Sequence, residues 1–283
     1  MSKQQQPDIR FFSFAGKNAP KTVIQFDGDI YKRSVTMDSG VFHGSIFCEA
    51  GWFMKPFQKP TLKKHDSDAL LVFIGSNPED PENLNAEIEL WIENDKLILT
   101  TTCFVFIPKG TAYGNMVIKN LTKPVLHYVS LMDTDTYHVS PAEATAAPGT
   151  YTGNVIEKYA PVDGRIPEAP EGFLTLILWI DGLKLKGAPY MEACWFHTTN
   201  DTGPEAHLHD NLDELIGFLG TDPDNPEELY AEVKFFVEDR EITITKSCIV
   251  YIPRGVRHSP ILVPKLERPI MHFSGGNGGN YYR

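Results

Sequence analysis

The chain repeats itself at a spacing of 145 residues, and this repeat restricts the fold more than any other feature of the sequence. Residues 73–110 align with residues 218–255 without a gap, and 15 of the 38 positions are identical. A period of this length has the size of a domain and not of one solenoid unit. The sequence therefore predicts one domain in residues 1–145 and a second in 146–283, joined near the small, proline-containing stretch 140–149.

The four cysteines follow the same repeat. Cys103 and Cys248 occupy equivalent positions in the aligned segments, and Cys48 matches Cys194 at an offset of 146 residues. We therefore expect two copies of one cysteine pair. None of them forms a Cys-x-x-Cys motif, so buried, unpaired thiols in a reducing compartment are predicted.

Both halves are built from short apolar segments that are separated by glycine and proline turns. In the second half, residues 173–180 and 248–252 have the length and composition of buried strands. Residues 231–238 and 241–245 flank a hairpin turn at Asp239–Arg240. Few segments have the period of a helix, so the pattern predicts an all-β protein that forms a sandwich or a barrel.

The overall composition excludes several classes of partner. The formal net charge is -11, which opposes binding to nucleic acids and to anionic membranes. The hydrophobic fraction is 42%, and no apolar run is long enough to span a bilayer. The segment Met1–Pro7 lacks the apolar stretch of a secretory signal, so a cytoplasmic location is expected.

The second half carries a set of residues with the spacing of metal ligands. His207 and His209 are two positions apart, so on a strand both side chains would face the same side. Glu214 follows after a short turn, and His258 follows a proline–glycine turn. Three imidazoles and one carboxylate predict a mononuclear site for one divalent transition metal ion per chain: Fe, Mn, Ni, Cu or Zn.

These residues resemble a known family. The pattern His207-x-His209-x4-Glu214-x5-Gly220, followed by Pro253-x-Gly255-x-x-His258, resembles the two cupin motifs, and the whole chain resembles a bicupin. The resemblance implies two tandem double-stranded β-helix (jelly-roll) barrels with a metal inside the C-terminal one. Its ligands would be His207, His209, Glu214 and His258. The family's glycine usually stands five residues before the first histidine, whereas Gly203 lies nearer.

The acidic ligand has two candidates. Asp213 precedes Glu214 and lies six residues before Gly220, a spacing that cupins also use. We favour Glu214, because counting by twos from it directs Ile216 and Phe218 into the barrel.

The first half lacks this ligand set. Its first histidine position is Lys63, its glutamate position is Ala69 and its last histidine position is Tyr113, so only His65 remains. One imidazole does not hold a divalent ion, and we expect the N-terminal barrel to be metal-free and to serve as a packing partner.

Four further residues are weaker candidates for a catalytic role. Glu192 and His197 lie on a predicted strand before the first motif, and they face opposite sides of it, so at most one points inward. Tyr251 and Arg257 flank the second motif. For each of the four, a surface or packing role is the competing interpretation.

The first hypothesis is therefore a metalloenzyme that acts on a small-molecule substrate. Dioxygenase-like oxidation heads the reaction classes, followed by isomerisation, decarboxylation and hydrolysis. Oxalate decarboxylase-like bicupins resemble the chain in architecture, although its first half lacks their ligands. The alternatives are a metal-dependent binding protein without turnover and a structural or storage bicupin. Because cupins often associate through barrel edges, a homodimer is a further expectation.

Overall fold

The computed structural model describes residues 11–16, 26, 28–164, 166 and 169–279. This part of the chain contains no α-helix, and its one named helix is the short 3-10 helix η2 (Thr152–Asn154). No helix within it is long and apolar enough to cross a membrane. The segment Met1–Pro7, on which the expected location was argued, lies outside the described residues.

The first half forms two facing sheets, which we call the N-terminal sandwich. The larger sheet has the strand order β12-β8-β5-β10-β3-β2, and the smaller one has the order β11-β4-β9-β6-β7. Their strands are β2 (Tyr31–Met37), β3 (Phe47–Phe53), β4 (Phe57–Lys64), β5 (Ala69–Gly75), β6 (Asn83–Ile92), β7 (Asp95–Thr101), β8 (Cys103–Ile107), β9 (Tyr113–Lys119), β10 (Val125–Leu131), β11 (Ser140–Pro141) and β12 (Val155–Ile156).

The second half forms the C-terminal sandwich in the same way. Its larger sheet has the order β1-β18-β15-β20-β14-β13, and its smaller sheet has the order β17-β16-β19. The strands are β1 (Phe12–Phe14), β13 (Leu174–Ile180), β14 (Tyr190–Phe196), β15 (Glu214–Leu219), β16 (Glu228–Val237), β17 (Arg240–Lys246), β18 (Cys248–Ile252), β19 (His258–Leu266) and β20 (Ile270–Gly276). The predicted all-β class with jelly-roll barrels is confirmed.

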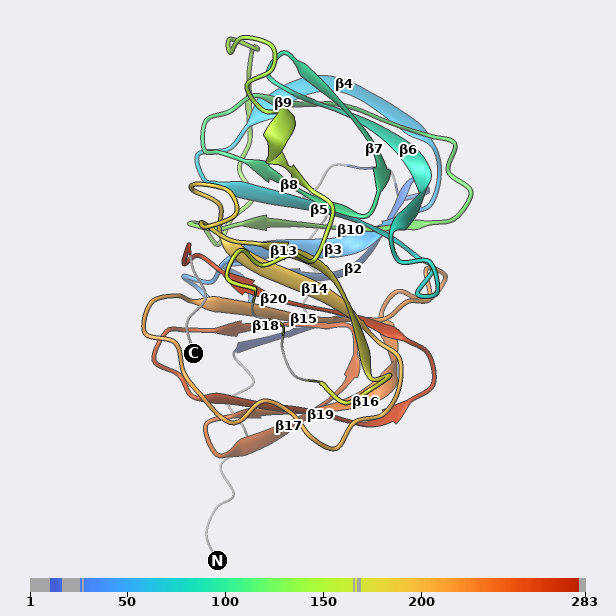
Figure 1. Cartoon of the computed structure of the whole chain (residues 1–283), viewed down its shortest axis with the longest axis vertical. Helices are drawn as coiled ribbons and strands as arrows, with labels where there is room; N and C mark the ends of the chain where they lie inside the picture. The colour runs from blue at the N-terminus through green and yellow to red at the C-terminus, as the bar shows by residue number, and fades with distance from the viewer. Residues whose placement is uncertain (1–10, 17–25, 27, 165, 167–168, 280–283) are drawn as a thin grey trace, which may run out of the picture.

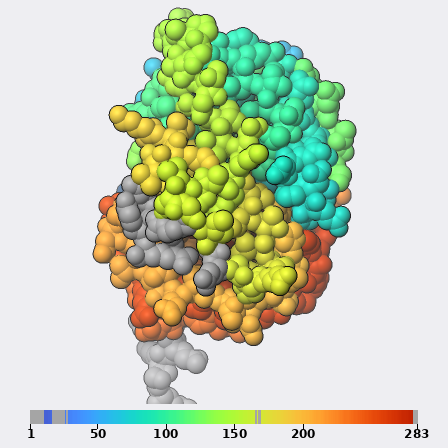
Figure 2. Space-filling view, in the orientation of Figure 1, coloured from blue at the N-terminus to red at the C-terminus, as the bar shows by residue number. Residues whose placement is uncertain are grey.

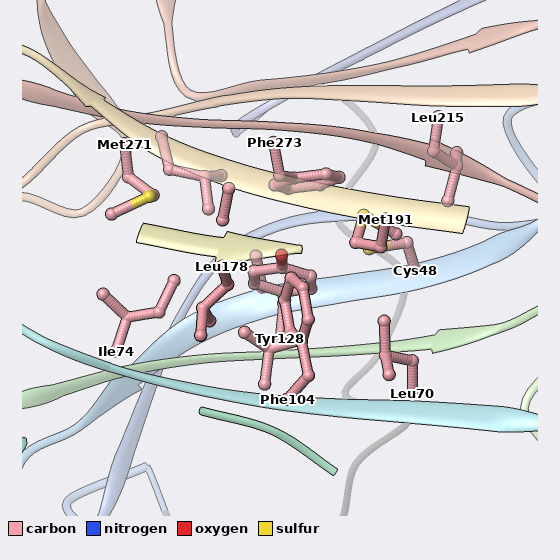
Figure 3. Close-up of a cluster of buried hydrophobic side chains, with 14 of the residues drawn as sticks. Cys48, Leu70, Ile74, Phe104, Tyr128, Leu178, Met191, Leu215, Met271 and Phe273 are labelled. Carbon is pink, nitrogen blue, oxygen red and sulfur yellow. The ribbon is translucent and has the colours of Figure 1, made fainter. Parts of the chain in front are cut away.

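The four sheets stack as layers, with the two larger sheets in the middle (Figure 1). Each larger sheet is buried on both faces, which explains why strands such as β5 are continuous apolar runs. In β5, Leu71 and Phe73 fill the N-terminal sandwich, whereas Leu70 and Ile74 point into the layer between the sandwiches. Figure 3 shows this middle layer, to which strands of both halves contribute side chains.

The strand register confirms the sequence repeat and corrects one part of it. The strands β6, β7, β8 and β10 begin 145 residues before β16, β17, β18 and β20. However, Cys48 pairs with Ser130, whose counterpart Gly275 pairs with Met191. The counterpart of Cys48 is therefore Met191, and the predicted equivalence of Cys48 and Cys194 is wrong. The segment between β14 and β15 is two residues longer than that between β3 and β5, so the offset is 143 residues in β3 and β14 and 145 from β5 and β15 onward.

Each half also lends one strand to the sheet of the other. β1 pairs with β18, and β12 pairs with β8. The segment before β12 is held against the N-terminal sandwich, because Glu93 accepts hydrogen bonds from the backbone N–H groups of Thr145 and Ala146. In Figure 2 this yellow-green segment runs over the surface of both halves. The domain boundary between residues 145 and 146 stays a prediction.

Candidate metal centre

The first and last histidines of the predicted set face each other across a single β-bridge. The N–H of His207 donates to the carbonyl of His258 at 3.0 Å, and the N–H of His258 donates back at 2.9 Å. The expectation that His207 and His209 lie on a strand is wrong, because only this isolated bridge forms there. Pro204 precedes it and has no N–H to offer to a ladder.

The other two residues are fixed by their own backbone contacts. The carbonyl of His209 accepts a hydrogen bond from the N–H of Gly255 at 2.8 Å, which ties it to the proline–glycine turn before His258. Glu214 is the first residue of β15 and pairs with Ile252 of β18. Four positions spread over about fifty residues of sequence are thereby brought to one end of the C-terminal sandwich.

The four side chains converge closely. The ligand nitrogens of His207, His209 and His258 lie within 4.8 Å of one another, and within the described part of the chain no other group of three His, Cys, Asp or Glu has this spacing. Oε2 of Glu214 is 2.9 Å from Nε2 of His258 and 3.5 Å from Nε2 of His209. His209, Glu214 and His258 are buried, and His207 is half-buried at the open side.

Hydrogen bonds orient these side chains for metal binding. Nδ1–H of His207 donates to the carbonyl of Glu205 at 2.7 Å, and Nδ1–H of His258 donates to the carbonyl of Val256 at 3.1 Å. In a neutral imidazole with this hydrogen bond the lone pair lies on Nε2, and Nε2 of His258 faces Oε2 of Glu214. The hydroxyl of Ser274 donates to Oε1 of Glu214 and holds the carboxylate in place.

The surroundings of the site lower the pKa of His207 and of Glu214. Burial lowers the pKa of His207, and the nearby His258 and His209 lower it further. Burial alone would raise the pKa of Glu214, but hydrogen bonding and charge from His209 and His258 outweigh it and hold the pKa well below its usual range. Three imidazoles and one ionised carboxylate in a largely buried cluster are a donor set that a divalent cation can bind.

The cluster opens into a cavity of about 210 Å³ inside the C-terminal sandwich. His207, Glu214 and His258 line one part of it. Most of the remaining wall is apolar or weakly polar, with Phe173, Leu174, Leu176, Cys194, Phe196, Ile216 and Ile261 among its residues. The cavity therefore has room for a small organic molecule beside the proposed ligands.

The weaker candidates separate into one residue in the cavity and three outside its lining. Glu192 lines the cavity and accepts a hydrogen bond from the hydroxyl of Tyr159 at 3.2 Å. The ring of His197 contacts the Thr175 hydroxyl at 2.9 Å. Tyr251 packs in the layer between the sandwiches, and Arg257 is exposed. Of these candidates, only Glu192 is positioned to meet a bound molecule.

The structure brings Glu214, and not Asp213, to the histidines. Asp213 accepts hydrogen bonds from the backbone N–H of Arg254 at 3.0 Å and from its guanidinium at 2.9 Å. In the first half, Asp68 accepts a hydrogen bond from the N–H of Lys109 at 2.7 Å in the equivalent arrangement. The aspartate therefore holds the proline–glycine turn in both halves.

One pair of equivalent histidines in the repeat was not identified from the sequence. His127 and His272 are 145 residues apart, and each donates Nδ1–H to a carbonyl of the neighbouring strand, that of Val72 and of Gly217 respectively. Both are buried, and burial lowers the pKa of each to about 4. Each ring packs between two phenylalanine rings, which are Phe53 and Phe73 for the first and Phe196 and Phe218 for the second.

No protein-family model matches the chain, and no curated protein does either. Solved structures do match. An oxalate decarboxylase structure described for its substrate binding mode and reaction specificity switch has a TM-score of 0.58 and 10% sequence identity, covering 94% of this chain and 80% of its own. A point mutant of Bacillus subtilis oxalate decarboxylase gives a TM-score of 0.57 at 11% identity with the same coverage.

A third structure concerns the Mn(II) centres of Bacillus subtilis oxalate decarboxylase, with a TM-score of 0.55 and 11% identity over 94% of this chain and 80% of that one. Identities this low carry the fold and not the reaction. The protein therefore has the cupin fold.

Proposed function

We propose that the protein is a bicupin metalloenzyme that converts a small organic molecule in the cavity of its C-terminal sandwich. His207, His209 and His258 would hold one divalent transition metal ion through Nε2, and Glu214 would hold it through its carboxylate. The observation that carries the proposal is the cluster of three histidine nitrogens within 4.8 Å of one another, with Oε2 of Glu214 beside Nε2 of His209 and His258.

A bound ion would supply Lewis acidity to a substrate oxygen or a site for O2. The chain's own contribution is to surround the substrate with a largely apolar wall and to place a second carboxylate in the same cavity. Glu192 lies on β14, where it pairs with Ser274, the residue that holds Glu214. A carboxylate in this place can accept or return a proton from a molecule bound beside the histidines. This arrangement favours turnover over binding alone.

Two reaction classes are the leading candidates for this site. Dioxygenase-like oxidation is the class that we put first for three imidazoles and one carboxylate with an accessible face. Decarboxylation comes second, and the likeness in fold to oxalate decarboxylases favours it. The apolar wall formed by Phe173, Leu176 and Ile216 favours a substrate with a larger and more apolar body than a two-carbon diacid.

The test compares wild-type protein with Glu192→Gln on a panel of small carboxylic, hydroxy and enolic acids, following both O2 uptake and CO2 release. Metal content should be the same in both proteins, whereas turnover should fall about 100-fold or more in the variant. Glu82→Gln, an exposed position in the N-terminal sandwich, is the matched control and should retain full activity.

Three outcomes distinguish the alternatives. Metal binding with turnover that depends on Glu192 supports the enzyme. Metal binding and ligand binding without turnover would replace it with a metal-dependent binding protein. A protein that takes up no metal, even after reconstitution with Fe, Mn, Ni, Cu and Zn, would contradict the proposal.

A further inference from the structure

The N-terminal sandwich contains a cavity of its own at the place where the C-terminal sandwich has the histidine cluster. Lys63 pairs with Tyr113 in the register that brings His207 opposite His258. The carbonyl of His65 accepts a hydrogen bond from Gly110, as that of His209 does from Gly255. Lys63, His65 and Tyr113 therefore replace the three histidines, position by position.

These residues form a hydrogen-bonded set around a cation. Nζ of Lys63 donates to the hydroxyl of Tyr137 at 2.6 Å. The ammonium also lies 5.2 Å from the ring centroid of Tyr113 and 5.3 Å from that of Tyr137, within the range of cation–π attraction. The hydroxyl of Tyr113 donates to Nε2 of His65 at 2.7 Å, and Nδ1–H of His65 donates to the carbonyl of His138. The set places the ammonium of Lys63 at the position of His207, and Ala69 stands at the position of Glu214.

Among the described residues, the cavity wall contains two lysines and no carboxylate. Lys59 and Lys63 line it, together with Tyr113, Tyr137 and His127 as the remaining titratable residues. No carboxylate in the described ranges lies within 4.0 Å of Nζ of Lys63. The buried Glu49 is held by Thr36 and does not line the cavity. Burial, with a smaller contribution from Lys59, lowers the pKa of Lys63 to about 8, which is the cost of a partly dehydrated cation without a counter-ion.

The other walls of the cavity are mostly apolar. Its apolar lining comes from Phe26, Leu71, Phe73, Leu90, Met116 and Val129. The cavity has a volume of about 40 Å³, which is room for roughly three water molecules. A short apolar chain with one charged end fits these walls better than a fully oxygenated anion such as phosphate, because few donors besides Lys63 and the tyrosine hydroxyls are present.

We propose that the N-terminal cavity binds a small monocarboxylate without a metal, with the carboxylate on Lys63 and Tyr137 and the short apolar chain against Phe73 and Leu90. The ammonium of Lys63 then supplies the positive charge that a metal ion supplies in the proposed C-terminal site. The inference is independent of the proposed function, since none of its residues belongs to the C-terminal cavity.

Propionate is the probe, and propionamide is its neutral isostere. Binding to the full-length protein is measured by ligand-observed NMR, in the wild type and in Lys63→Met, Tyr137→Phe and His258→Ala. A five-atom ligand held by one charge-assisted pair should bind with a dissociation constant on the order of 1 mM. Loss of the ammonium should weaken propionate at least about tenfold, and loss of the tyrosine hydroxyl should weaken it several-fold.

The variants separate the two cavities. His258→Ala should bind propionate as the wild type does, and propionamide should bind at least about tenfold more weakly than propionate. Thermal unfolding of each variant verifies that it is folded, and Tyr137→Phe retains the test if Lys63→Met is not. Absence of propionate binding, equal binding of propionamide, or binding that depends on His258 and not on Lys63 would each overturn the inference.

Discussion

The rings of Tyr128 and Phe273 stack in the layer between the two sandwiches, with centroids 4.4 Å apart and planes inclined by 18° (Figure 3). These two positions are equivalent in the repeat, because they too are separated by its period of 145 residues. When equivalent residues of two copies contact each other, a local two-fold axis passes between them. The duplicated halves therefore pack as a symmetric dimer packs, and the aromatic pair marks its axis.

This pair should contribute strongly to stability. Both side chains are fully buried, so Tyr128→Ala should lower the free energy of unfolding by about 3–5 kcal/mol. The Tyr128 hydroxyl has no hydrogen-bond partner among the described residues, so Tyr128→Phe should be neutral or raise that free energy by up to about 1 kcal/mol. Denaturant unfolding measures both. Ile98→Ala, at an exposed position, is the control and should change it by less than about 0.5 kcal/mol. A destabilising Tyr128→Phe would show that the hydroxyl has a partner.

The ends of β5 and β15 require glycine for the same reason in both halves. A Cβ atom at Gly75 would lie 1.9 Å from the carbonyl oxygen of Asn83, and at Gly220 it would lie 1.9 Å from that of Glu228. Because the clashing atoms belong to the backbone, they can move away only by distorting the strands. Gly75→Ala and Gly220→Ala should therefore each lower the free energy of unfolding by about 2 kcal/mol or more. At Gly153 an added Cβ would have no atom within 4 Å, so Gly153→Ala should be close to neutral. Thermal unfolding of the three variants and the wild type measures these effects.

The neighbouring acids of the second half should have separable effects on metal content. Glu214→Gln removes the charge that faces the histidines and should abolish stoichiometric metal binding, as measured by elemental analysis. Asp213→Asn should retain the metal and lower the free energy of unfolding by about 1 kcal/mol, because it weakens the contact with Arg254. The opposite pattern, with metal lost only in Asp213→Asn, would transfer the ligand role to Asp213.

The buried histidine of the first half should make stability depend on pH. The pKa of His127 falls from 6.5 to about 4 in the folded state because of burial. Between these pH values the unfolded chain binds a proton that the folded chain excludes, so stability falls as the pH drops from 6.5 to 4 and is unaffected by this residue above that window. Comparison of unfolding curves for wild type and His127→Asn should show a slope that is lower in the variant by up to about 1.4 kcal/mol per pH unit. Equal slopes would mean that His127 is protonated in the folded protein.

Much of the architecture could be predicted from the sequence, because the repeat and the strand pattern are properties of local periodicity and self-similarity. The strands 173–180 and 248–252 are found as β13 and β18 with small changes of boundary. The Cys48–Cys194 equivalence was wrong because one matched residue type carries little information when the intervening segments differ in length. Strand pairing, which needs both partners, gives Met191 instead.

The four residues that the sequence predicts as ligands lie together in the structure, but the residues that surround them were not predicted. Asp213 could have been recognised as structural, because its counterpart Asp68 persists in the half that has lost the histidines. The pair His127 and His272 could have been found by extending the repeat alignment beyond residue 110. The convergence of Ser274 on Glu214 depends on the register of β15 against β20, which no local pattern encodes.

Localisation in the cytoplasm and assembly as a homodimer remain predictions from the sequence and the family resemblance. A storage role also remains an alternative, and it predicts neither a stoichiometric metal nor an effect of Glu192→Gln on turnover.

Elemental analysis of protein purified without chelator, for wild type, His258→Ala and Tyr113→Ala, shows directly whether the chain holds one metal ion in its C-terminal sandwich. We expect about one Fe, Mn, Ni, Cu or Zn per chain in the wild type and in Tyr113→Ala, and its loss in His258→Ala. Full occupancy in His258→Ala, or loss of the metal in Tyr113→Ala, would contradict a single site in the C-terminal sandwich.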